Sequence, residues 1–284
     1  MGAGSSTKKA EVPSADSTDT RAETSAQRAA ALGLVLSKSG IDRVILIRHA
    51  NAKPRDLKAA ENEAAMQDGL KSHRGVLKPG APYANSWTVG DLTRQLTSKG
   101  EEQAANAKEW LSAYKLRAVI SSEATRAWAT KDIMAPGFPN GGPATLTLHT
   151  LHPARSGTPD CEKMFDSLGY GTLNRYFADT SVEGCEGRGK EVFRHYMNKV
   201  TGELHELLSE GKEGMGAEGD TVAVFGHAVF LNAVAVAVGE AMGIDNAMEL
   251  VGSLDLGEAQ GIMCDASAKS IELLGSYDGG ATMR

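Results

Sequence analysis

The chain has 284 residues with a formal net charge of -6 at pH 7, and 41% of its residues are hydrophobic. This length and apolar content allow one large α/β domain or two small ones, and the negative charge argues against a nucleic-acid-binding surface. The longest apolar run, Ala228 to Val238, is too short to span a bilayer. Three cysteines without a C-x-x-C spacing indicate a reducing compartment, and we therefore expect a cytoplasmic protein.

The first 38 residues differ in composition from the rest of the chain. They are rich in Ala, Ser and Thr and mix charges without periodicity, which predicts a largely disordered tail over residues 1–38. The tail begins M-G-A-G-S-S, a pattern that fits N-myristoylation at Gly2. A single acyl chain would give weak, reversible membrane attachment. The other interpretation is a Gly/Ser tail that only happens to match the pattern.

A short apolar strand then ends in an arginine and a histidine. Residues 44–51 are V-I-L-I-R-H-A-N, so Arg48 and His49 come directly after the apolar run. The carboxyl end of a parallel strand faces the crevice in which α/β proteins bind ligands. A guanidinium beside an imidazole suits a phosphate, because the first binds two oxygens and the second can act as a nucleophile.

The segment 53–94 is predicted to be an insertion. Its first part, Asp56 to Gln67, is rich in Ala and Glu and indicates a short helix, and Lys71 to Gly90 holds the Gly and Pro residues of a loop. An insertion directly after Arg48 and His49 is expected to line the mouth of their pocket. The alternative is a surface elaboration without a catalytic part.

A second strand is also followed by an arginine that could bind a phosphate. A helix is predicted from Ser98 to Tyr114, with Ser98 and Glu101 as a capping box, and a strand from Arg117 to Ser121 follows it. Arg126 lies near the start of the next helix, where a helix N-terminus also favours an anion.

The remaining elements alternate between strands and helices. Residues 145–149 alternate as a strand, residues 151–176 look irregular, and an amphipathic helix is predicted over 191–209. The strand Thr221 to Phe225 then ends in Gly226 and His227.

A buried helix over 229–242 and short strands over 260–264 and 270–274 complete the pattern. We therefore predict an α/β fold for residues 39–284: a three-layer sandwich with a mostly parallel central sheet and helices on both faces.

The three strand ends together define a candidate pocket. Placed side by side, Arg48, His49, Arg126 and His227 supply two guanidinium groups and two imidazoles. This is the set of groups that a transferable phosphoryl group needs, and it requires no metal or other cofactor.

Four motifs in this order resemble those of a known family. They are R-H-A-N-A, L-T-S-K-G-E-E-Q-A, S-S-E-A-T-R-A-W-A-T and F-G-H-A. Over roughly residues 42 to 275 the chain is similar to the phosphoglycerate-mutase-like branch of the histidine phosphatase superfamily, and within it to the short bacterial phosphohistidine phosphatases. The resemblance implies that His49 becomes phosphorylated and that Arg48, Arg126 and His227 hold the phosphoryl oxygens.

The proton donor to the leaving group is less clearly marked. Relatives in the family use a carboxylate after the Arg126-type motif, and the candidates here are Glu162 first, then Asp160 and Asp166. The alternative is that all three are solvated loop charges, since the bacterial phosphohistidine phosphatases lack a dedicated acid. Asn51 follows the nucleophile closely and is a candidate substrate-binding residue.

These patterns lead to one favoured function and one alternative. The favoured function is a metal-independent phosphatase that hydrolyses a phosphomonoester or phosphoramidate, on a phosphorylated small molecule or phosphoprotein. Mutase activity is not expected, because the R-H-G and N-R-F-type signatures of the mutases are missing. His149 and His152 have H-x-x-H spacing, but nothing in the pattern completes a metal site. The alternative is a non-catalytic scaffold that uses the fold within a larger assembly.

Overall fold

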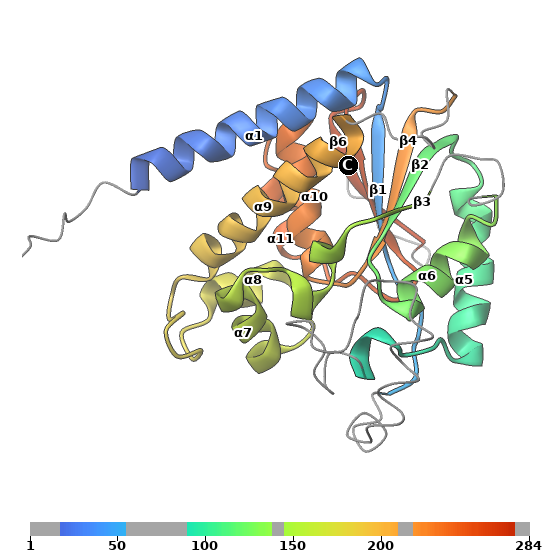
Figure 1. Ribbon diagram of the computed structural model, residues 1–284, viewed down its shortest axis with the longest axis horizontal. Coiled ribbons are helices and arrows are strands. Elements are labelled where there is room, and N and C mark those ends of the chain that lie inside the picture. The colour runs from blue at the N-terminus through green and yellow to red at the C-terminus, as the bar shows by residue number, and fades with distance from the viewer. Residues whose placement is uncertain (1–17, 55–89, 138–144, 210–217, 276–284) are drawn as a thin grey trace, which may run out of the picture.

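The computed structural model describes residues 18–54, 90–137, 145–209 and 218–275. Helices and strands alternate along the chain (Figure 1). The strands are β1 (Arg43–Arg48), β2 (Leu116–Ser121), β3 (Thr145–Thr147), β4 (Thr221–Gly226), β5 (Gly261–Asp265) and β6 (Ser270–Leu274). The α-helices are α1 (Thr18–Lys38), α5 (Ser98–Leu111), α6 (Thr125–Met134), α7 (Pro159–Leu168), α8 (Leu173–Ala178), α9 (Gly189–Ser209), α10 (Phe230–Ala241) and α11 (Ala247–Gly252). Two 3-10 turns, η1 (His149–Leu151) and η2 (Pro153–Arg155), follow β3.

The strands form one mixed sheet in the order β3-β2-β4-β1-β5-β6. Strands β3, β2, β4 and β1 are parallel, whereas β5 is antiparallel to β1 and β6 is antiparallel to β5. Arg48 is in register with Gly226, and Ser121 with Phe225, so β1, β4 and β2 end at the same level of the sheet. This arrangement confirms the predicted α/β fold with a mostly parallel sheet.

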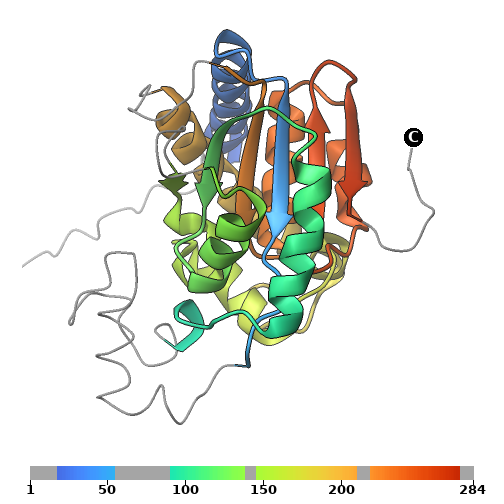
Figure 2. The ribbon, with the colours of Figure 1, turned by 90° about the vertical axis from the view of Figure 1, so that its right-hand side faces the viewer.

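Helices cover both faces of the sheet (Figure 2). Alternate residues of a strand face opposite sides, so Leu46 of β1 belongs to the core under α1, α9 and α10, whereas Ile45 and Ile47 pack under α5 and α6. Because both faces are buried, β4 is apolar along most of its length and all of its residues are buried. The three layers are therefore those that the sequence predicts.

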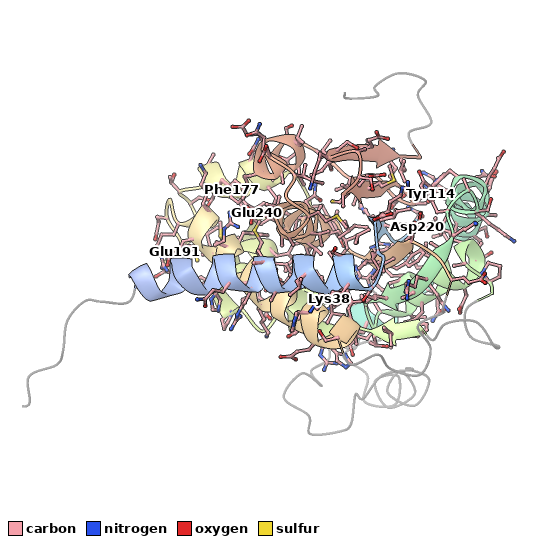
Figure 3. The ribbon with its side chains drawn as sticks, turned by 90° about the horizontal axis from the view of Figure 1, so that it is seen from above. Lys38, Tyr114, Phe177, Glu191, Asp220 and Glu240 are labelled. Atoms are coloured by element: carbon pink, nitrogen blue, oxygen red, sulfur yellow. The ribbon has the colours of Figure 1, made fainter. Side chains whose placement is uncertain are left out.

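The expected disorder of residues 1–38 is wrong for its second half. Residues 18–38 form α1, which packs on α9 and α10 and lies across one end of the molecule, with Lys38 at its C-terminal end (Figure 3). Leu32 and Leu36 lie one helical turn apart and are both buried in the core. This apolar pair gives the helix a face to bury, which the polar composition of the tail as a whole concealed.

The segment over 151–176, expected to be irregular, contains two α-helices. Helix α7 begins at Pro159, a residue that suits the first helical position, and buries Cys161 and Met164. Helix α8 begins after Thr172, whose side chain accepts a hydrogen bond from the backbone of Arg175. Their few turns offered too short a periodic signal to separate from the loops around them.

Helix α5 begins against the chain that leaves β1. Its N-cap is Thr97 rather than the predicted Ser98, and the Thr97 hydroxyl accepts a hydrogen bond from the Gly100 amide at 3.0 Å. A Cβ on Gly100 would lie 2.0 Å from the carbonyl oxygen of Asn51. Only glycine therefore lets the helix approach the segment that follows His49.

Replacing Gly100 with alanine is expected to destabilise the protein by about 1–3 kcal/mol, because backbone atoms must move apart to admit the methyl group. The matched control is Gly202→Ala in α9, where the added Cβ would meet only Arg28 Nη1 at 3.8 Å. That change is expected to leave the stability unchanged or raise it by up to about 1 kcal/mol. Urea unfolding measures both, and equal free energies of unfolding for the two variants would contradict the prediction.

Two sequence predictions lie outside the described residues. These are acylation at Gly2 and the helix and loop within 56–90, apart from Gly90 itself. Within the described ranges, no helix combines the length and the apolar character that crossing a membrane requires.

Candidate active site

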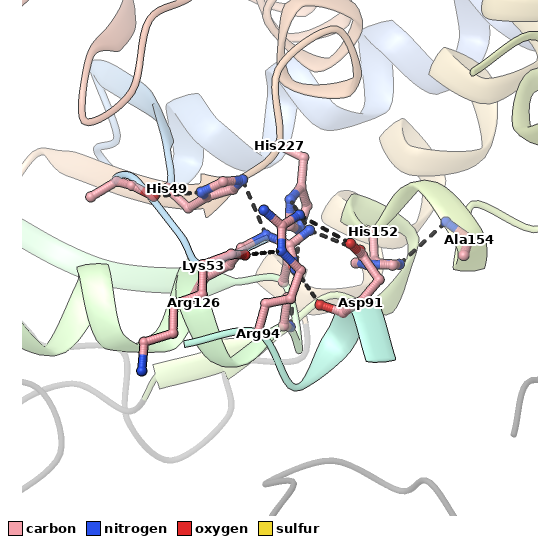
Figure 4. Close-up of polar contacts among 11 residues, drawn as sticks. His49, Lys53, Asp91, Arg94, Arg126, His152, Ala154 and His227 are labelled. Atoms are coloured by element: carbon pink, nitrogen blue, oxygen red, sulfur yellow. Dashed lines mark hydrogen bonds and ion pairs between the residues drawn. The ribbon is translucent and has the colours of Figure 1, made fainter. Parts of the chain in front are cut away.

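The residues that follow β1, β2 and β4 meet at the C-terminal edge of the sheet. These three strands are neighbours, and His49, Ser122 and His227 come directly after them. The structure brings His49, Arg126 and His227 into one hydrogen-bonded cluster (Figure 4). The side chains of all three are almost completely buried.

His49 is held in one tautomer. Its Nδ1–H donates to the backbone carbonyl oxygen of Ala50 at 2.8 Å, and its Nε2 accepts from the Arg126 Nε–H at 3.1 Å. The lone pair of Nε2 therefore faces a guanidinium group. Burial, together with the positive charge of Arg126, holds the pKa of His49 well below its usual value. His49 is thus a neutral imidazole, which is the nucleophilic form.

Arg126 is the centre of the cluster. It is the second residue of α6, and its side chain is fully buried. Besides the bond to His49, its Nη2 donates to His227 Nδ1 at 3.1 Å and to Asp91 Oδ2 at 2.9 Å. Its Nη1 donates to the backbone carbonyl oxygen of Asp91 at 2.5 Å. One guanidinium group therefore connects three strand-end segments with the chain around Asp91.

His227 is also a neutral ring in this arrangement. Its Nδ1 accepts from Arg126, so its Nε2–H donates to Ser122 Oγ at 2.9 Å. Burial and the nearby positive charge of Arg126 hold the pKa of His227 well below its usual value. Protonation of His227 would need the negative charge of a bound phosphoryl group beside it.

A strained turn fixes the position of His227. Val229 has φ 61° and ψ -48°, and the Phe230 amide donates to the Ala228 carbonyl oxygen at 2.9 Å. This is the rare γ-turn, which is costly for a β-branched residue. Val229 is fully buried and its amide donates to the Asn232 side chain, so the surrounding structure holds the turn in place.

Asp91 and His152 complete the cluster, although sequence reasoning assigned neither to it. His152 Nε2–H donates to Asp91 Oδ2 at 2.8 Å, and His152 Nδ1 accepts from the Ala154 amide at 3.2 Å. Burial alone would raise the pKa of Asp91, but the Arg126 guanidinium and the His152 hydrogen bond outweigh it and hold the pKa far below its usual range. Asp91 is therefore an ionised carboxylate. The side chain of His152 is fully buried.

Arg48 is the last residue of β1 and directly precedes His49. Its Nη1 donates to the Leu256 carbonyl oxygen at 2.7 Å, and its guanidinium group lies 4.9 Å from the centre of the Tyr170 ring. The Nε–H of Arg48 is buried and has no hydrogen-bond partner among the described residues. Its charge also contributes to the lowered pKa of His49, so a buried, unsatisfied cationic donor lies close to this ring.

The other candidate residues have contacts outside the cluster. Asn51 donates to the Glu258 carboxylate at 2.9 Å and accepts from the Thr97 hydroxyl at 2.7 Å. Glu162 accepts from the Ser156 hydroxyl at 2.9 Å and from the Gly157 amide at 3.0 Å, which ties down the turn before α7. No described hydrogen bond joins either side chain to His49, Arg126 or His227.

The carboxyl group of Glu123 anchors the segment that carries His152. It is buried, and Oε2 accepts from His149 Nδ1 at 2.8 Å and from Arg155. Oε1 is buried without a hydrogen-bond partner among the described residues. These ion pairs hold residues 149–155 against the end of β2, and this places His152 beside Asp91. Among the described residues, no group of histidine, cysteine, aspartate or glutamate side chains is arranged to hold a metal ion.

The buried histidines predict a pH dependence of stability. The pKa values of His49 and His227 are lowered by folding, so the unfolded chain takes up protons first as the pH falls below about 6.5. Stability is therefore full above this pH and decreases below it by about 1.4 kcal/mol per pH unit for each ring. Between pH 7.5 and 5.5 we expect a loss of about 3 kcal/mol, measured by urea unfolding. Burial also lowers the pKa of His152, which adds to the loss, so His227→Gln should remove about a third to a half of it. Stability that does not change with pH would contradict the prediction.

Comparison with known sequences identifies the family. Residues 84–250 match the sequence profile of the histidine phosphatase superfamily (branch 1), a match that covers most of the chain. The chain belongs to the histidine phosphatase superfamily, as its motifs predicted. The matched range contains Arg126 and His227 but begins after His49, whose strand is joined to the matched part by the pairing of β1 with β4. A search of curated protein sequences gives no match.

Solved structures with a similar chain trace are distant in sequence. A candidate α-ribazole-5'-P phosphatase from Escherichia coli is 18% identical with a TM-score of 0.43, over 85% of this chain and 99% of that one. A mycobacterial glucosyl-3-phosphoglycerate phosphatase is 16% identical with a TM-score of 0.42, over 78% of this chain and 92% of that one. A phosphoserine phosphatase from Entamoeba histolytica is 15% identical with a TM-score of 0.43, over 83% of this chain and 98% of that one. None of these likenesses bears on the substrate of this chain.

Proposed function

We propose that the chain is a metal-independent phosphatase that hydrolyses a phosphomonoester or a phosphoramidate through a phosphohistidine at His49. The observation that carries this proposal is the neutral imidazole of His49, whose Nε2 lone pair faces the Arg126 guanidinium at 3.1 Å. A nucleophile beside a buried cation is the arrangement that attack on a phosphoryl group requires.

In the first step, the Arg126 Nε–H leaves His49 Nε2 and binds a phosphoryl oxygen. The freed Nε2 lone pair of His49 forms a bond to phosphorus as the bond from phosphorus to the leaving oxygen or nitrogen breaks. Arg126, His227 and the Nε–H of Arg48, which has no partner in the described part of the chain, offset the charge on the non-bridging oxygens. The hydrogen bond from Nδ1–H to Ala50 stabilises the ring as it becomes positively charged. In the second step, water attacks phosphorus as the bond to Nε2 breaks, the proton that water loses passes to a phosphoryl oxygen, and inorganic phosphate leaves.

The leaving group constrains the substrate class. Glu162 is held in a turn by Ser156 and Gly157, and Asp91 is ionised, so neither is set up to give a proton to the leaving group. A phosphoramidate leaving group departs more readily than an alkoxide. We therefore favour a phosphohistidine or another phosphoramidate as substrate over a phosphate ester of a simple alcohol.

The test is phosphate release by the purified full chain in the presence of EDTA. The panel contains p-nitrophenyl phosphate, a phosphohistidine peptide and a set of sugar phosphates. Activity that survives EDTA and is lost in His49→Gln supports the proposal, and a higher kcat/KM for the phosphohistidine peptide supports the substrate class. Loss of activity with EDTA, or activity that persists in His49→Gln, would overturn it.

One observation favours the scaffold as a second candidate. His49, Arg126 and His227 are closed off from solvent, and the Arg126 guanidinium is bound by groups of the chain itself. A folded protein that releases no phosphate from any member of the panel would favour this second candidate.

A further inference from the structure

All three nitrogens of the Arg126 guanidinium group donate hydrogen bonds to other groups of the chain. Nε donates to His49, and Nη2 donates to both His227 and the Asp91 carboxylate. Nη1 donates to the Asp91 backbone carbonyl at 2.5 Å. A phosphoryl group that binds Arg126 with two oxygens needs donors on the edge that Asp91 now occupies.

The Asp91 carboxylate has the contacts that a phosphoryl group would make. Oδ2 accepts from a guanidinium at 2.9 Å and from the His152 imidazole at 2.8 Å, and Oδ1 accepts from the Arg94 guanidinium at 3.2 Å. Figure 4 shows Asp91 beside Arg126, Arg94 and His152. Two guanidinium groups and an imidazole around a carboxylate form an anion site that is already filled.

We propose that Asp91 is an internal anion that occupies the phosphoryl site and competes with phosphorylated ligands for Arg126. The inference rests on the proposed function, because it takes Arg126 as the phosphoryl-binding residue. Asp91 is then an affinity-determining residue. A ligand binds only when its phosphoryl group displaces the carboxylate from Arg126.

Charge makes the two occupants mutually exclusive. A phosphoryl group in contact with Arg126 would lie beside a carboxylate bonded to the same guanidinium, and like charges at this distance repel strongly in a buried site. The low pKa of Asp91 means that protonation does not relieve this repulsion near neutral pH. The burial of His49, Arg126 and His227 agrees with a site that is filled from within.

Arg94 tethers Asp91 to the segment that follows His49. Its Nε donates to the Lys53 carbonyl oxygen at 2.7 Å, while its Nη1 binds Asp91. The Lys53 amide in turn donates to the Gln95 carbonyl oxygen at 2.9 Å, and Ala52 and Leu96 form an isolated β-bridge. The carboxylate is thus held in the site by a contact that can be weakened without removing the carboxylate itself.

The experiment is a calorimetric titration of the full chain with inorganic phosphate at pH 7.5. Asp91→Asn keeps the shape of the side chain and removes its charge, and we expect phosphate to bind about tenfold or more tightly than to the wild type. The matched control is Asp220→Asn, which removes the carboxylate that pairs with Arg43 at the opposite end of the sheet (Figure 3). We expect no change in phosphate affinity there. Unchanged or weaker binding by folded Asp91→Asn overturns the proposal.

A second variant covers the case in which Asp91→Asn does not fold. Arg94→Lys keeps the positive charge of the site but lacks the Nε–H that binds the Lys53 carbonyl oxygen, so it loosens the tether. It is expected to tighten phosphate binding by about threefold or more, in the same direction as Asp91→Asn. Unchanged or weaker affinity in this variant also overturns the proposal. Phosphate binding needs no turnover, so a gain in affinity in a protein that hydrolyses nothing rejects the proposed function and keeps this inference. Hydrolytic activity without the gain in phosphate affinity supports the proposed function and overturns this inference.

Discussion

His49→Gln is expected to lower kcat by about four orders of magnitude or more, because the variant has no nitrogen lone pair with which to form the covalent intermediate. The glutamine carboxamide retains an acceptor for the Arg126 Nε–H, which now bonds to His49 Nε2 at 3.1 Å. The fold should therefore persist while the chemistry is lost. This is the largest effect on activity that the structure predicts.

The measurement is a single-turnover assay with a 32P-labelled substrate, followed by denaturing gels. The wild type should carry label that is stable in alkali and labile in acid, as expected for phosphohistidine, and the variant should carry none. The control is His195→Gln, a change to an exposed histidine on α9, which should label as the wild type does. Labelled His49→Gln protein would place the covalent intermediate on another residue.

Arg126→Met is expected to destabilise the protein by about 3–5 kcal/mol, the largest effect on stability in the described structure. Methionine occupies much of the space of the arginine stem but leaves the Asp91 carboxylate buried without its main cation. Activity should fall as well, by about a hundredfold or more, because the charge facing the phosphoryl group is gone.

A double-mutant cycle separates the charge from the packing. Asp91→Asn combined with Arg126→Met should recover about 1–3 kcal/mol relative to the sum of the single changes, because neither buried charge is then left without a partner. The control is Arg43→Met, which breaks the pairs with Asp220 at 2.7 Å and with Asp265 at 2.8 Å and should cost about 2 kcal/mol or less. Urea unfolding measures all four variants. Equal losses in Arg126→Met and Arg43→Met would contradict the prediction.

The strand ends could be predicted because a buried parallel strand appears in the sequence as a run of apolar residues. Residues 44–47 and 222–225 are such runs, and polar groups of the site follow each of them within two residues. Strand β3 covers residues 145–147 rather than the predicted 145–149, because it lies at the edge of the sheet. It pairs only with β2, through residues 145–147.

Asp91 and His152 could not be found in this way. Asp91 reaches Arg126 across 35 positions and His152 across 61, and no periodicity of the chain reports contacts between such distant residues. The sequence around an aspartate before the L-T-S-K-G motif is the same whether its carboxylate is solvated or buried against a guanidinium group. For Glu162, the family resemblance suggested a proton donor to the leaving group. An acidic residue is equally suited to the first turn of α7, where the Glu162 carboxylate accepts hydrogen bonds from a hydroxyl and a backbone amide.

The place of β1 in the sheet has a consequence for how the protein is made. Both neighbours of β1, β4 and β5, come from the last third of the chain, and Arg43 bonds to Asp220 across 177 positions. While the ribosome is still synthesising the middle of the chain, His49 is already outside the exit tunnel on a strand that has no partner. Contacts of such sequence separation form slowly and leave an apolar strand exposed to aggregation in the meantime. His49 is therefore the first of the cluster's residues to be synthesised, and its strand gains both partners only after β4 and β5 have been made.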